Sequence, residues 1–356
     1  MTKSKDLLKK LVSAPGLSGN EASIRSIVAD AWSPLVDDLT TSKLGSLHGL
    51  QRGLGKEPRP SILLATHMDA IGLMVSSITD GFLRVDEIGG IDPRVLPGQS
   101  VIVHGAGGRE FPGLIVQPPE HTLPDHQRNS PVPLESLWVD TGLSPRQVAR
   151  RIQLGDLVSF DSEAVEIGET LAGHSLDNRA SIVALTEALT LLKKRPHDWD
   201  VWAVATVQEE ETLGGARTSA FALRPTLAIA IDVTWAKGPG SSGYETFAMN
   251  KGPVLAWGPN IHPKLFHELK KAADRLEMDF KTEPVPGMSG TDAVSLQVAA
   301  SGAPTAVISI PLRYMHTPVE MVHTKDITRV ARLLAEFMAE LDDEFLDKIA
   351  WRKSKA

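Results

Sequence analysis

The feature that most constrains this chain is an apolar run that ends in a cluster of acids. Residues 201–207 read Val-Trp-Ala-Val-Ala-Thr-Val, and Gln208 and three glutamates (Glu209, Glu210 and Glu211) follow. Such a run is typical of a buried β-strand. In an open α/β sheet, ligands bind beyond the carboxyl ends of the strands, so these acids are candidates for a functional site. Considered alone, the segment could also be a solvated acidic turn.

Three other segments have the same form. In each, a strand-like run precedes potential metal ligands: 61–66 before His67 and Asp69, 227–231 before Asp232, and 305–310 before His316. An Asp inside an apolar run is costly to bury unless it is paired or coordinated, which favours a functional role for Asp232. Because side chains at the carboxyl ends of parallel strands converge on one crevice, the pattern predicts an α/β fold with a polar site at one sheet edge.

Asp177 is a further candidate, because it precedes a predicted helix. Four apolar residues after it recur at helical spacing: Ile182, Leu185, Leu189 and Leu192. Asp is favoured at helix N-termini, so it could be a helix cap. It could also be a metal ligand held by the same geometry, and the two interpretations are compatible.

Composition excludes several classes of protein. A net charge of −7 gives no reason to expect a nucleic-acid partner. The chain has no cysteine, so any metal must be bound by His, Asp and Glu. No signal peptide is recognisable, and no apolar run approaches the roughly 20 residues that cross a bilayer. We therefore expect a cytoplasmic protein without a membrane partner.

The chain of 356 residues is longer than one ordinary core, which predicts a large and a smaller domain. Residues 71–165 contain short alternating segments punctuated by Gly and Pro, which indicates a small β-rich domain. We expect it to be inserted into a catalytic α/β domain formed by residues 1–70 and 166–356.

A proline-rich loop at residues 117–133 contains Glu120, His121, Asp125 and His126. These side chains could form a second metal site. An exposed loop is the favoured interpretation, because prolines and irregular spacing give the four side chains no common face.

The candidate ligands are sufficient for two divalent ions. Imidazoles and carboxylates without thiolates suit Zn, Co or Mn. In a two-metal centre a carboxylate bridges the ions, which would assign His67, Asp177 and Asp232 to one ion and Asp177, Glu210 and His316 to the other. Glu209 would remain free to act as a general base toward a metal-activated water. Asp69 could accept the second ring N–H of His67 and fix its tautomer.

Five motifs in order along the chain carry a family resemblance. They are His67-x-Asp69, Leu176-Asp177-Asn-Arg-Ala, Thr206-Val-Gln-Glu-Glu210, Ala230-Ile-Asp232-Val-Thr and Arg313-Tyr-Met-His316. Together they resemble the glutamyl aminopeptidase family of dinuclear-metal peptidases, which includes the tetrahedral aminopeptidases. The segments Gly113-Leu-Ile-Val-Gln-Pro-Pro-Glu-His-Thr122 and Trp138-Val-Asp-Thr-Gly142 resemble the dimerisation domain of that family.

The resemblance implies a peptidase-type α/β/α sandwich with an inserted PDZ-like β-barrel. It also implies an aminopeptidase that acts on free N-termini of peptides and dimers that assemble into a homo-oligomeric dodecamer. Glu209 would be the base and Glu210 a ligand, whereas Glu211 has no assigned role. We expect His316 to be the second histidine ligand and His323 to be a surface or helix-entry residue.

Other functions remain open at this point. A carboxypeptidase-type enzyme or a deacylase on the same scaffold would use the same metal ligands. A polysaccharide-active or non-catalytic relative would keep the sheet, but a scaffold has no use for six convergent polar groups. The preferred N-terminal residue of the substrate does not follow from the sequence.

Overall fold

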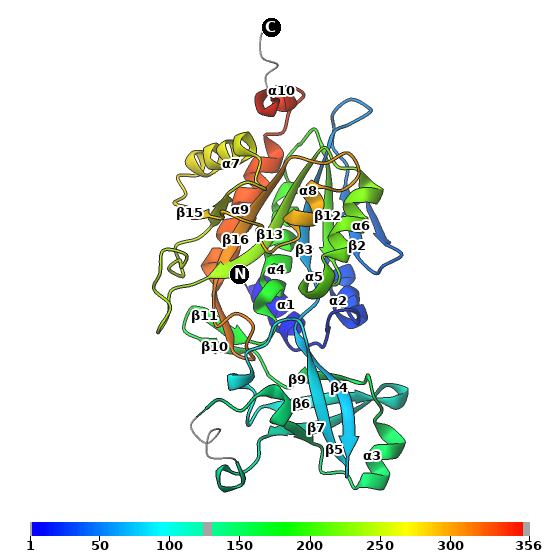
Figure 1. Ribbon diagram of the computed structural model, residues 1–356. Coiled ribbons are helices and arrows are strands. Elements are labelled where there is room, and N and C mark those ends of the chain that lie inside the picture. The colour runs from blue at the N-terminus through cyan, green and yellow to red at the C-terminus, as the bar shows by residue number, and fades with distance from the viewer. Residues whose placement is uncertain (1, 124–129, 352–356) are drawn as a thin grey trace.

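The computed structural model describes residues 2–123 and 130–351. It is a mixed α/β fold joined to a closed six-stranded antiparallel barrel, and Figure 1 shows the barrel at one end of the molecule. The predicted fold class, an α/β sandwich with a β-barrel inserted in the chain, is confirmed.

The helices and strands have the following bounds. The α-helices are α1 (Thr2–Val12), α2 (Ala22–Trp32), α3 (Pro145–Arg151), α4 (Leu176–Leu192), α5 (Glu209–Thr212), α6 (Gly214–Leu223), α7 (Pro263–Arg275), α8 (Ala293–Gln297), α9 (Thr324–Ala339) and α10 (Phe345–Ile349). The strands are β1 (Asp38–Thr41), β2 (Leu47–Gln51), β3 (Ser61–His67), β4 (Gly72–Thr79), β5 (Phe82–Ile88), β6 (Ser100–Gly105), β7 (Arg109–Val116), β8 (Trp138–Asp140), β9 (Leu157–Phe160), β10 (Val165–Ile167), β11 (Thr170–Gly173), β12 (Asp200–Thr206), β13 (Leu227–Trp235), β14 (Val254–Trp257), β15 (Lys281–Pro284), β16 (Thr305–Arg313) and β17 (Glu320–His323).

The main sheet is built around four adjacent parallel strands in the order β12-β3-β13-β16. Their apolar runs are buried almost throughout, as expected for parallel strands covered on both faces. Antiparallel strands extend the sheet on both sides, and β14 and β15 form a short branch beside β16.

Helices form layers on both faces of this sheet (Figure 1). The long helix α4 packs against α9, α1 and α2, and it also contacts β3 and β13. Helices α6 and α8 pack together against β12, β13 and β16. None of the helices in the described ranges is long and apolar enough to span a membrane.

The barrel has a core of its own, separate from that of the main sheet. Its strands close in the order β4-β5-β8-β7-β6-β9 around buried residues such as Leu73, Val101, Val139 and Val158. All six strands lie between residues 72 and 160, and the short strand β10 already pairs in the main sheet. The chain therefore leaves the main sheet after β3 and returns to it at β10.

Residues 117–123 and 130–133 of the proline-rich loop contribute to none of the ligand clusters found in the described part of the chain. Glu120 and His121 are exposed on a single 3-10 turn. Asp125 and His126 lie outside the described residues.

Candidate metal centre and active site

The parallel strands bring the predicted ligands to one edge of the main sheet. Strand β3 ends at His67, which lies in register with Thr206 at the end of β12, three residues before Glu209. Strand β13 contributes Asp232, three residues before its end. The predicted convergence at the carboxyl ends of these strands is observed in the structure. It follows from the parallel direction and the register of the strands, which bring their carboxyl ends to the same edge of the sheet.

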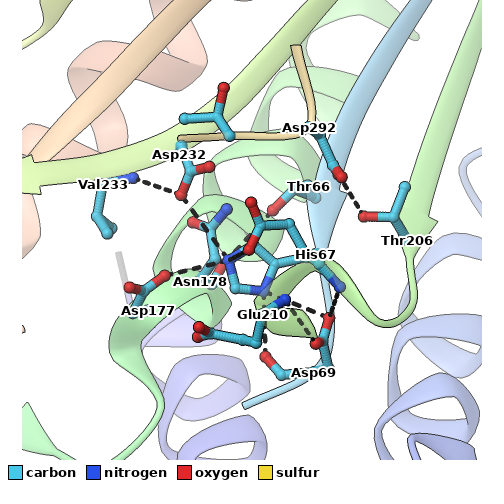
Figure 2. Close-up of polar contacts among 12 residues, drawn as sticks. Thr66, His67, Asp69, Asp177, Asn178, Thr206, Glu210, Asp232, Val233 and Asp292 are labelled. Carbon is cyan, nitrogen blue, oxygen red and sulfur yellow. Dashed lines mark hydrogen bonds and ion pairs between the residues drawn. The ribbon is translucent and has the colours of Figure 1, made fainter. Parts of the chain in front are cut away.

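One cluster of ligand atoms contains His67, Asp177 and Asp232, whose donor atoms lie within 4.8 Å of one another. Nε2 of His67 is 3.1 Å from Oδ1 of Asp177 and 3.8 Å from Oδ1 of Asp232. All three side chains are buried, and Figure 2 shows both carboxylates on the same side of the His67 ring, where they approach its Nε2.

A second cluster contains Asp177, Glu210 and His316. Nε2 of His316 is 3.5 Å from Oδ2 of Asp177 and 3.5 Å from Oε2 of Glu210. Asp177 thus turns one carboxylate oxygen toward each histidine. That arrangement is the one a bridging carboxylate requires.

The position of Asp177 is set by the start of helix α4. Asp177 and Asn178 have non-helical dihedral angles, and Ser175 occupies the N-cap position. The Asn178 side chain donates a hydrogen bond of 2.8 Å to the Ile231 carbonyl of β13, which ties the helix start to the strand that carries Asp232.

Glu209 belongs to neither cluster but lies beside the first one. Its Oε2 is 3.9 Å from Nε2 of His67. Its side chain is only 10% exposed. Burial raises the pKa of this carboxyl well above its ordinary value, whereas the charge of His67 opposes the rise. Glu209 is therefore a carboxylate beside the ligands that takes part in neither group.

The charges of the site call for a cation. Burial raises the pKa of Glu210 and of Asp232 well above ordinary values, and in both cases Asp177 adds to the rise. Burial opposes ionisation of Asp177 too, but hydrogen bonds with His316 and His67 hold its pKa well below the ordinary value. No Lys or Arg within the described ranges forms an ion pair with these carboxylates. Divalent cations fit this set of imidazole nitrogens and carboxylate oxygens.

Asp69 positions both glutamates through their backbone. Its two carboxylate oxygens accept hydrogen bonds from the N–H groups of Glu209 and Glu210, at 2.9 and 3.1 Å (Figure 2). Nδ1 of His67 lies 3.1 Å from the Asp69 carbonyl oxygen and 3.6 Å from the nearer carboxylate oxygen. The closer ring partner is thus the backbone carbonyl, while the carboxylate accepts the two backbone N–H groups at the start of α5.

Glu320, a residue that was not predicted from the sequence, positions Asp177 and His316 through their backbone, as Asp69 positions Glu209 and Glu210. Its carboxylate accepts hydrogen bonds of 2.9 Å from the backbone N–H groups of Asp177 and His316. The side chain is 1% exposed. An acid within the segment Val319-Glu320-Met321 is the kind of signal that identified Asp232, so the same argument about burial could have found it.

Glu211 joins the acidic cluster to the barrel. Its Oε1 accepts a hydrogen bond of 2.6 Å from the N–H of Gly89, in the loop after β5. The neighbouring Gly90 lies against His316: a Cβ at this position would be 3.3 Å from Nδ1 of the ring. The barrel loop thus forms part of the surroundings of the second cluster.

His323 is a helix-entry residue and is not on the surface. It is the N-cap of α9, where its Nδ1 accepts a hydrogen bond from the N–H of Lys325. The side chain is buried because β17 carries it into the main sheet. The alternative of a surface position is therefore wrong.

The clusters open into a cavity of about 460 Å³. Its wall includes parts of β13, β14, β15 and β16 and the loop around Gly290. Asp292, in the same loop, accepts a hydrogen bond of 2.5 Å from the Thr206 hydroxyl (Figure 2). The cavity therefore provides space for a substrate directly beside the ligand atoms.

Sequence comparison finds aminopeptidases both among family profiles and among individual proteins. The profile of the M42 glutamyl aminopeptidase family matches residues 45–333. A lysyl aminopeptidase from Pyrococcus furiosus is 36% identical over 341 residues, which cover 94% of this chain and 97% of that protein.

Solved structures are similar over nearly the whole chain. The crystal structure of the TET aminopeptidase from the marine sediment archaeon Thaumarchaeota archaeon SCGC AB-539-E09 aligns with a TM-score of 0.92 and 31% identity, covering 98% of this chain and 99% of that one. PhTET1-12s, described as a dodecamer, aligns with a TM-score of 0.81 and 29% identity over 94% of this chain and 99% of that one.

Proposed function

Because this chain belongs to the M42 glutamyl aminopeptidase family and is a hydrolase of aminopeptidase type, we propose that it removes the N-terminal residue of peptides with a dinuclear metal centre and Glu209 as general base. One observation carries the proposal. The two carboxylate oxygens of Asp177 face two histidines in separate ligand clusters, and one further glutamate beside them remains unassigned.

The proposed ligands are His67, Asp177 and Asp232 for one ion and Asp177, Glu210 and His316 for the other. Two divalent ions, with Zn favoured and Co or Mn also compatible with these donors, are the proposed cofactors. Held there, they would supply the positive charge that lowers the pKa of the attacking water and stabilises the developing oxyanion.

Glu209 is proposed to accept a proton from the attacking water and to return it to the leaving amine. Its position beside His67 and outside both clusters supports this role. Burial keeps the carboxyl away from bulk water, which raises its pKa and makes it a stronger base than an exposed glutamate. The Asp69 carboxylate accepts a hydrogen bond from the backbone N–H of Glu209, which fixes the backbone position from which the Glu209 side chain extends.

The barrel is proposed to mediate dimerisation, and the dimers to assemble into a dodecamer. The dodecameric description of PhTET1-12s supports this assembly. A sizing column coupled to light scattering measures it directly: a monomer or an isolated dimer at working concentration would contradict the proposal.

Paired peptides with a free and an acetylated N-terminus test the activity. The metal-loaded enzyme is expected to release the first residue of the free peptide and to leave the acetylated one intact. Chelation should abolish the activity, and readdition of a divalent metal should restore it. Cleavage of the acetylated peptide, or release of the C-terminal residue, would favour the deacylase or carboxypeptidase-type alternatives.

A further inference from the structure

The cavity beside the ligand clusters has an apolar wall with one additional acid. Val233, Trp235, Val285 and Met315 line it, and Glu283 is the single carboxylate in the lining that belongs neither to the two clusters nor to Glu209. No lysine or arginine of the described chain lines this cavity. The wall therefore combines apolar surface with one negative charge.

Glu283 is held in place by the sheet. It lies on β15 opposite Ala256 of β14, and its Oε1 accepts a hydrogen bond of 2.6 Å from the hydroxyl of Thr234. The side chain is half-buried. None of the ion pairs found within the described ranges includes Glu283, so its charge has no cationic partner in that part of the chain.

The position of Thr234 relates Glu283 to the reacting centre. Thr234 follows Asp232 by two residues on β13, so both side chains point to the same face of the strand. Two residues of a strand span roughly 6 to 7 Å, which is comparable to the length of an extended lysine side chain. A substrate side chain that leaves the ligand clusters along β13 would reach the Glu283 carboxylate.

The chemistry of this wall selects among substrate side chains. An acidic side chain would meet a like charge there, and a short apolar one would leave the charge of the half-buried Glu283 carboxylate uncompensated, with only the hydrogen bond from Thr234 to stabilise it. A side chain with an aliphatic stem and a cationic head matches both parts of the wall, because Lys and Arg pack their stems on apolar surface. Burial raises the pKa of Glu283, as does the charge of nearby Glu245, and a bound cation would reverse this effect.

Resting on the proposed function, we propose that Glu283 is a specificity residue that makes this enzyme prefer peptides with an N-terminal lysine or arginine. The carboxylate contacts the cationic head of that side chain, while Val233, Trp235 and Val285 contact its stem. The hydrogen bond from Thr234 fixes the carboxylate in the orientation that receives the cation.

Steady-state kinetics with lysyl, arginyl, leucyl and glutamyl peptides of one common sequence test the proposal. Wild type is expected to hydrolyse the lysyl and arginyl peptides with the highest kcat/KM. Glu283→Gln should lower kcat/KM for these two by about 10- to 100-fold, the scale of a lost hydrogen bond between charged groups, and should leave the leucyl peptide within about threefold. Glu277→Gln, which removes an exposed acid outside the cavity lining, is the matched control and should leave the order of preference unchanged.

An equal loss on the leucyl and lysyl peptides would show that Glu283 only anchors β15, and a wild type that prefers leucyl peptides would overturn the proposal as well. Calorimetric binding of L-lysine amide and L-leucine amide separates this proposal from the activity itself. If no peptide is cleaved, the proposed function fails, yet tighter binding of lysine amide that Glu283→Gln removes would still support the specificity residue. Equal binding of both amides to wild type would refute it.

Discussion

The two halves of the candidate centre share Asp177 but differ in how far solvent reaches them. The His67 side chain is 2% exposed and the Asp232 side chain 8%. The His316 side chain is 36% exposed and lies under the barrel loop at Gly90. Metal sites closed by protein tend to be structural, whereas catalytic sites keep an open position. The His67 side should therefore retain its ion more tightly than the His316 side.

Removing the shared ligand should have the largest effect. Asp177→Ala is expected to lose both ions together and to lower turnover by at least about 10⁴-fold, because both clusters depend on this carboxylate. Metal analysis of the purified variant measures the loss. Asp177→Asn keeps the shape of the side chain and serves as the control for folding. Retention of one tightly bound ion would show that the two halves are independent.

Glu209→Gln should leave both halves intact and affect only the proton transfer. Turnover is expected to fall by roughly 10² to 10⁴, the usual contribution of a general base. Metal content should stay near that of wild type, since Glu209 belongs to neither cluster. Full activity in this variant would rule out Glu209 as the base.

Chelation should separate the two halves. We expect one ion to be removed at a chelator concentration at least about 10-fold lower than the other, since the exposed His316 side opens to solvent. Metal analysis along a chelator titration would show two steps, and His316→Ala should lack the first of them. Simultaneous loss of both ions at every concentration would contradict the difference between the halves.

Glu211→Gln tests the barrel loop and should have the smallest effect. The variant weakens the hydrogen bond to the N–H of Gly89, so the loop beside His316 is held less firmly. Turnover should fall by about 2- to 10-fold, consistent with a neutral replacement of one charge-assisted bond. The first ion in the chelator titration should leave more easily while the second is unaffected. A change in the second step alone would mean that the loop acts on the His67 side, which would contradict the prediction.

Much of the fold and most members of the candidate site could be predicted from the sequence. The apolar runs before His67, Glu209 and Asp232 required buried parallel strands, and the structure arranges them side by side. The family membership inferred from five ordered motifs is confirmed. The roles of the ligand and base residues remain predictions that the experiments above would test.

The residues that support the site could not be read in the same way. Glu320 bonds two backbone N–H groups that are 139 positions apart in the chain, at Asp177 and His316. The Asp69 carboxylate accepts hydrogen bonds from the backbone N–H groups at the start of α5, although the sequence suggested the ring of His67 as its partner. Such contacts depend on where the backbone of another element ends, which no local pattern records.

The sequence by itself determined the strands, the ligand types and the absence of thiolates, because the pattern of apolar residues and the chemistry of each side chain are local properties of the sequence. Only the tertiary structure decided which oxygen of Asp177 faces which histidine, that Glu211 holds the barrel loop, and that Glu283 borders the cavity without a cationic partner among the described residues. These are distances of a few ångströms between segments far apart in the chain. Sheet register and packing fix them, and both arise only when the whole chain has folded.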